Sequence, residues 1–192
     1  MQDRLLNMSP EGGWRETGDT QLAPLTDGEM NWFQRRLTRY LVQRHQVPAH
    51  NLFATFLHAP RIFLAWLPFA SQLMPYGSLT RRQTELVILR VAWRSRCRYE
   101  WVQHVQIGRA AGLSDEDILR VTDTPGGTGW TSLEAALLQA VDDVVDTGVV
   151  STETWTSLSS GLSKRKLTEA VMLIGHYCML ASVIDSLGVE VE

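Results

Sequence analysis

The sequence of 192 residues is poor in cysteine, with Cys97 and Cys178 as its only two. Two cysteines are too few for the disulfide framework of a small secreted domain. Charge is also nearly balanced, because 18 Lys and Arg residues stand against 21 Asp and Glu residues. A net charge of −3 gives no electrostatic reason to expect nucleic acid or an anionic membrane as a partner.

Long hydrophobic runs are missing as well. The longest apolar stretch, residues 62–70, contains Pro68 and is too short to span a bilayer. The chain does not begin with the charged segment and apolar core of a secretory signal peptide. From these observations we expect a cytoplasmic protein.

The alternation of apolar and polar residues that is typical of β-strands is absent, as are repeats and low-complexity segments. Apolar residues instead recur at helical spacing, for example over residues 131–145. The sequence therefore predicts an all-α fold, with one compact helical domain over residues 25–192. Residues 1–24 mix glycine with charge and show no period, so we expect a flexible or loosely draped N-terminal arm.

Capping boxes, in which a Ser or Thr is followed three residues later by Glu or Gln, mark helix starts. Thr26 with Glu29 predicts a helix to about residue 44, whose apolar stripe includes Trp32, Phe33 and Tyr40. Further helix starts are predicted at Thr80, Ser114, Thr131 and Ser151, and a last helix over residues 164–187.

The pattern of residues 80–112 predicts two successive helices whose inner faces carry ionisable or reactive side chains. At about 100° per residue, the face opposite the solvent-seeking side chains carries Glu85, Cys97, Glu100 and His104. Buried ionisable groups are costly unless paired, and convergent ones are typical of catalytic sites. A purely structural hydrogen-bonded cluster, with Glu100 bonded to His104 one turn away, remains the alternative.

These residues, in the context CRYEWVQHVQIGRAAGLSDEDI, resemble the carboxymuconolactone decarboxylase family, which includes the alkylhydroperoxidase D branch. The resemblance runs from about Asn51 to the C-terminus and includes GHYCMLASVIDSLGV. The peroxidase pattern is a Glu, eleven residues, Cys-x-x-Cys, and a His four residues further on. Glu85, Cys97 and His104 match it, but Glu100 stands at the second Cys. Glu100 and His104 match the Glu and His, four residues apart, that are usual in the decarboxylase branch.

The resemblance implies a fold of the alkylhydroperoxidase D-like type and a cofactor-independent enzyme acting on a carboxylated, lactone-like small molecule. His104 is the best general acid or base, since an imidazole titrates near neutral pH, and Glu85 and Glu100 would set its charge and tautomer. One alternative is a thiol-dependent peroxidase that uses Cys97, which as a free buried cysteine can equally be structural. Another alternative is a non-catalytic helical oligomer or ligand-binding protein.

Two aromatic residues are predicted to contact the substrate. Tyr177 can supply a phenol to the pocket and Trp101 can form its wall, with core packing as the alternative for both. We expect no metal, because no second Glu-x-x-x-His or His-x-x-x-His completes the Glu100 and His104 pair. The resemblance also implies a homo-oligomer, a dimer, trimer or hexamer, with the helix-rich N-terminal region contributing to its contacts.

Overall fold

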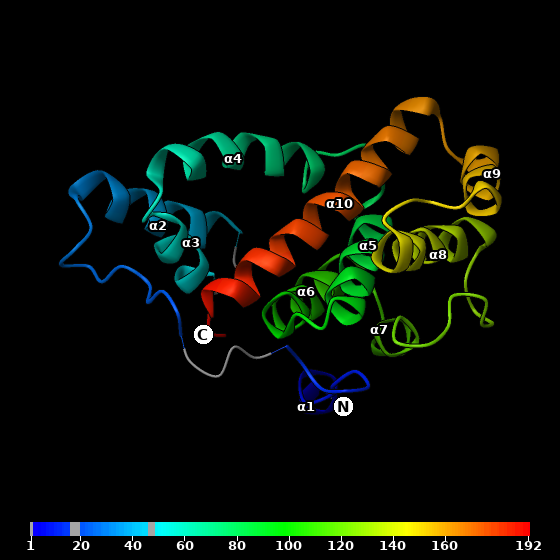
Figure 1. Cartoon of the computed structure of the whole chain (residues 1–192), viewed down its shortest axis with the longest axis horizontal. Helices are drawn as coiled ribbons and strands as arrows, with labels where there is room; N and C mark the ends of the chain where they lie inside the picture. The colour runs from blue at the N-terminus through cyan, green and yellow to red at the C-terminus, as the bar shows by residue number, and fades with distance from the viewer. Residues whose placement is uncertain (1, 16–19, 46–48) are drawn as a thin grey trace.

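A computed structural model describes residues 2–15, 20–45 and 49–192, and these residues form ten α-helices and no strand (Figure 1). The predicted all-α fold is therefore confirmed. The helices are α1 (Gln2–Leu6), α2 (Trp32–His45), α3 (His50–Phe56), α4 (Pro60–Leu73), α5 (Arg81–Arg94), α6 (Arg98–Ala110), α7 (Asp115–Arg120), α8 (Ser132–Thr147), α9 (Thr152–Gly161) and α10 (Lys164–Leu187).

Helix α10 crosses the middle of the molecule, with α4 on one side and α5 and α6 on the other (Figure 1). Among the described residues it is the one helix long and apolar enough to cross a membrane, with a mean hydropathy of 1.6. Half of that apolar window is buried inside the protein, and α10 packs on α5 and α8. Its apolar character therefore fits a core helix of this bundle.

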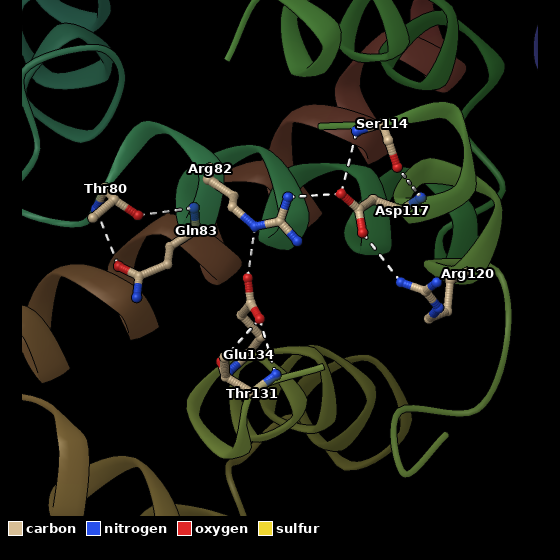
Figure 2. Close-up of polar contacts among 8 residues, drawn as sticks. All are labelled: Thr80, Arg82, Gln83, Ser114, Asp117, Arg120, Thr131 and Glu134. Carbon is tan, nitrogen blue, oxygen red and sulfur yellow. Dashed lines mark hydrogen bonds and ion pairs between the residues drawn. The ribbon is translucent and has the colours of Figure 1, made fainter. Parts of the chain in front are cut away.

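Arg82 ties α5 to the capped starts of two other helices (Figure 2). Its Nε donates to Glu134 at 2.8 Å, and its guanidinium also donates to Asp117 at 2.7 Å. Both carboxylates belong to capping boxes, with Thr131 at the start of α8 and Ser114 at the start of α7. The hydrogen bond from Arg82 lowers the pKa of Asp117 below its usual range. One arginine thus fixes how α5, α7 and α8 meet.

Arg90 makes a second, more deeply buried connection between α5 and α8. Two of its nitrogens donate to the carboxylate of Asp142 at 2.7 and 2.6 Å. Its third nitrogen donates to the carbonyl oxygens of Val121 and Asp123, just after α7. A buried arginine is tolerated because all its donor groups face acceptors.

The helix predicted from Thr26 begins later than expected. Thr26 and Glu29 do form their hydrogen bonds, but in a turn, and α2 starts at Trp32. The side-chain oxygens of Asn31 and Gln34 each accept a hydrogen bond from the backbone N–H of the other residue. This pair makes a second cap just before Trp32. The expected apolar stripe was also wrong in part, since Trp32, Phe33 and Tyr40 are exposed.

Helix α1, near the start of the chain, lies against α6 and α7. Leu5 is buried, and Trp14 packs edge-on against Trp93 with its ring centroid 5.6 Å away. Trp101 donates its indole N–H to the carbonyl of Leu5 at 2.8 Å. The boundary of the domain at residue 24 stays a prediction.

Candidate active site

A cavity of about 300 Å³ lies between α3, α4, α5, α6 and α10. Its wall is mostly apolar and aromatic, and its polar groups come from α4, α5, α6 and α10. Such a volume and lining are typical of a site for a small organic molecule. The residues that line it include Leu52, Phe53, Trp66, Leu67, Met74, Arg81, Tyr99, Glu100, Gln103, His104, Ile107, His176, Tyr177, Leu180 and Ile184.

His104 and Glu85 form the central polar pair of this cavity. His104 Nδ1 lies 2.7 Å from Glu85 Oε2, and both residues are buried. The pair links α6 to α5, which lie close together because Gly108 has no side chain. A Cβ atom at Gly108 would lie 3.0 Å from Leu113 and 3.3 Å from Leu89. Sequence analysis placed both residues of the pair on inward faces, and the structure brings them together.

Arg81 holds the other oxygen of Glu85, at 2.8 Å and one helical turn earlier on α5. A carboxylate that already accepts from an arginine is best satisfied if the imidazole nitrogen beside it carries a proton. Nδ1 of His104 is then the donor, and Nε2 is the nitrogen left for a molecule in the cavity. Sequence analysis missed Arg81, although its spacing of four residues from Glu85 is the signal of a helical ion pair.

Glu100 lines the same cavity but is not bonded to His104, contrary to the expected pairing. Both its carboxyl oxygens are buried without a hydrogen-bond partner among the described residues. Burial, and secondarily the nearby Asp185, raise the pKa of Glu100 well above its usual value. Burial of this kind favours the protonated form of the carboxyl group, which suits it to act as an acid.

Cys97 begins α6 but does not belong to the residues that line the cavity. Its side chain is fully buried, and burial together with Glu100 and Asp185 raises the pKa of the thiol well above its usual value. Burial and Glu100 also raise the pKa of Cys178, to about 11. Both cysteines are free, and both are held as thiols rather than reactive thiolates.

The two predicted substrate contacts differ in position. Tyr177 lines the cavity, and its ring stands edge-on to His104 at 5.3 Å between centroids. Trp101 does not form the cavity wall as expected, because it is fully buried in a separate cluster with Trp14 and Trp93. The reason is rotation along α6, where Trp101 follows Glu100 directly and points to the N-terminal segment instead.

Metal ligation finds no support in the part of the chain that the structure describes. No group of three or more His, Cys, Asp or Glu residues there is placed to hold a metal ion.

The family comparison matches the carboxymuconolactone decarboxylase family over residues 60–143, a segment that contains Glu85, Cys97, Glu100 and His104. This confirms the resemblance noted from the motif. No curated protein matches the chain.

Solved structures confirm the alkylhydroperoxidase D-like fold. An uncharacterized peroxidase-related protein from a Silicibacter species superimposes with a TM-score of 0.77 at 12% identity, over 92% of this chain and 93% of that one. A protein from Ralstonia eutropha with an alkylhydroperoxidase AhpD core gives 0.74 at 15% identity, over 89% and 93%. The debrominase Bmp8, a cysteine-to-alanine variant in complex with 2,3,4-tribromopyrrole, gives 0.74 at 11% identity, over 92% and 94%. These descriptions are nearer to the thiol-dependent alternative than to lactone decarboxylation.

Proposed function

Residues 60–143 belong to the carboxymuconolactone decarboxylase family, and from this premise we propose that the protein is a cofactor-independent enzyme that transfers protons on a small molecule in the cavity. One observation carries the proposal. A histidine oriented by Glu85 and a neutral carboxyl, that of Glu100, line the same mostly apolar cavity. Catalysis by proton transfer requires one group that accepts a proton and one that donates a proton, each suited to its role by its surroundings.

In this proposal Nε2 of His104 accepts a proton from the substrate, and Glu85 stabilises the imidazolium that forms. Glu100 donates a proton where negative charge develops. A carboxylated, lactone-like substrate suits this arrangement, because one nitrogen of Arg81 is buried at the cavity wall and has no hydrogen-bond partner among the described residues. In this reaction His104 takes the proton of the substrate's carboxylic acid, and the resulting carboxylate lies beside Arg81. When its bond to carbon breaks, the electron pair stays on carbon and the proton of Glu100 replaces the released carbon dioxide. The proton on His104 then restores Glu100.

Thiol-dependent peroxide reduction is the second candidate, and the names of the structural neighbours favour it. A peroxide would oxidise the thiol of Cys97 to sulfenic acid and leave as water or an alcohol, and an external thiol would restore Cys97. The raised pKa of this buried thiol and its position outside the cavity wall speak for proton transfer instead.

A panel of carboxylated lactones and of peroxides with a thiol reductant separates the two candidates. Lactone turnover that is lost in Glu100→Gln and His104→Gln but kept in Cys97→Ser supports proton transfer. Peroxide consumption that is lost in Cys97→Ser supports the thiol reaction and contradicts the proposal. If no compound is turned over but some bind, the protein is a ligand-binding member of the family.

Self-association is a further part of the proposal. Large apolar side chains are exposed on α2 and α4 in the single chain, among them Trp32, Tyr40, Ile62 and Phe69. Exposed apolar patches of this kind mark protein contacts, so we expect a homo-oligomer in which the N-terminal helices take part. Light scattering at micromolar concentration tests this, and a monomer mass contradicts it.

A further inference from the structure

The cavity has a second polar region, formed by His176 on α10 and Trp66 on α4. The two rings are stacked, with centroids 6.0 Å apart and planes inclined by 25°. Both residues line the cavity. His176 Nδ1 and Trp66 Nε1 are each buried without a hydrogen-bond partner among the described residues. The proton-transfer reaction proposed above uses neither of them.

His176 is fixed in place by the rings around it. Phe69 and Tyr177 stand edge-on to it, with centroids 5.3 and 5.2 Å away. Burial lowers the pKa of His176 to about 4, so the ring is neutral at physiological pH. A neutral imidazole has one nitrogen that donates and one that accepts. This ring is therefore a polar contact without charge in an otherwise aromatic wall.

Packing alone does not account for a histidine and a tryptophan at these positions. A phenylalanine at either would fill similar space without leaving a buried polar atom unpaired, and such an atom is costly to bury. Every other ring in contact with Trp66 is a phenylalanine, at Phe56 and Phe63. The unpaired nitrogens are thus the feature that a ligand can use.

The chemistry of the two nitrogens points to one type of ligand group. Trp66 Nε1 can only donate, whereas His176 Nδ1 accepts when the proton is on the other nitrogen. A single hydroxyl satisfies both, because it accepts from the indole and donates to the imidazole. We infer that His176 and Trp66 form a hydroxyl-binding subsite of the cavity, which selects flat apolar molecules with a phenolic or enolic hydroxyl.

The subsite is separated from the acid–base residues by one side chain. The ring of Tyr177 is edge-on both to His104, at 5.3 Å, and to His176. A bound molecule would then present its reacting end to His104 and Glu100 and its hydroxyl to His176. The biological role of the subsite rests on the proposed function, but its hydrogen bonding is tested by binding alone, whichever reaction the cavity performs.

Three probes of similar shape test the inference: 4-ethylphenol, 4-ethylanisole and ethylbenzene. The phenol can satisfy both nitrogens, the ether only Trp66, and the hydrocarbon neither. Binding is measured by calorimetry or by chemical-shift changes on the full chain. We expect the phenol to bind about tenfold more tightly than the hydrocarbon and the ether to lie between them, as one or two buried hydrogen bonds imply.

Trp66→Phe and His176→Phe remove one nitrogen each and keep an aromatic ring, and each should reduce the preference for the phenol severalfold. Trp130→Phe is the matched control, since Trp130 Nε1 is also buried and unpaired but lies outside the cavity, beside Arg120. If one of these two variants unfolds at a much lower temperature than the parent protein, probe binding to the other variant still tests the inference. Equal binding of the three probes, no saturable binding, or an unchanged preference in the folded Phe variants overturns the inference.

Discussion

Helix α5 carries arginines on two sides, and the two sides differ in how completely their polar groups are paired. Toward α7 and α8, Arg82, Arg90 and Arg94 are all bound to carboxylates, at 2.6 to 2.9 Å. The first of these networks is the one drawn in Figure 2. Toward α6 and α10, Glu85 is paired with Arg81 and His104, but polar atoms of Arg81, Glu100 and His176 have no partner among the described residues.

This difference distinguishes the side of α5 that fixes helix packing from the side that can bind a ligand. Fully paired buried charges define how helices meet, and they have no capacity left for a ligand. Incompletely paired groups around a cavity are costly to the fold, so a functional use is the physical reason to retain them. Four predictions test whether the two sides of α5 really differ in this way.

The largest effect is expected on catalysis at the incompletely paired side. With a substrate that responds, His104→Gln should lower turnover about 10²–10⁴-fold, because it removes the proton acceptor. Glu85→Gln should add little in the double variant, since Glu85 acts only through His104. Steady-state kinetics of the two single variants and the double variant measure this. Losses that multiply would show that Glu85 has a separate role.

Next comes the buried arginine of the paired side. Arg90→Leu should lower the free energy of unfolding by about 3–5 kcal/mol, because it leaves two backbone carbonyls without their partner and Asp142 with Arg94 alone. Chemical denaturation followed by circular dichroism gives the value. Any variant that remains folded should still bind small molecules in the cavity. Loss of binding in a folded Arg90→Leu protein would contradict the distinction between the two sides of α5.

A smaller loss is expected at Arg82, whose side chain is 34% exposed and therefore partly screened by solvent. Arg82→Met should destabilise the protein by about 1–2 kcal/mol, through the lost hydrogen bonds to Asp117 and Glu134. Arg165→Met is the control, since its pair with Glu169 lies at the surface and its side chain is 76% exposed. Thermal unfolding should rank the two variants in this order, and the reverse order contradicts the assignment.

The last effect concerns Glu100 and depends on pH. Its pKa is raised in the folded protein, so the stability it contributes at low pH is lost as pH rises above its unfolded value of 4.5. Glu100→Gln cannot lose a proton, and its stability relative to the parent should therefore increase from pH 5 to pH 8. His176 titrates in both proteins and cancels in the difference, whereas the charge of Asp185 adds to the effect because it raises the pKa of Glu100. A pH-independent difference, measured by urea denaturation, would place a cationic partner beside Glu100.

Local sequence signals were enough for most of the helices. The capping boxes at Thr80 and Thr131 and the helix start at Ser114 are present as predicted, because each cap involves residues only three apart. Thr26 also bonds to Glu29, yet this pair does not start a helix, since the competing pair of Asn31 and Gln34 lies nearer to the apolar run. A local rule identifies a cap but not which of two caps the helix uses.

The candidate site was predictable to the extent that it depends on helical periodicity. Glu85, Cys97, Glu100 and His104 are all buried, as their positions on the inner faces of two helices indicated. Periodicity does not say which inward residues meet across helices, and so the pairing of Glu100 with His104 was wrong. Trp101 and Cys97 face inward too, but on parts of α6 that do not line the cavity.

The sequence by itself determined the all-α fold, the resemblance of residues 60–143 to the carboxymuconolactone decarboxylase family, and the inward faces that carry the ionisable residues, because these depend on spacing along a helix. Tertiary structure alone decided that His104 binds Glu85, that Glu100 stays unpaired, and that Trp66 stacks on His176. Each of these joins residues from different helices or depends on what the other helices leave open. Such contacts depend on how closely the helix axes approach one another. The sequence of a single helix does not determine this distance.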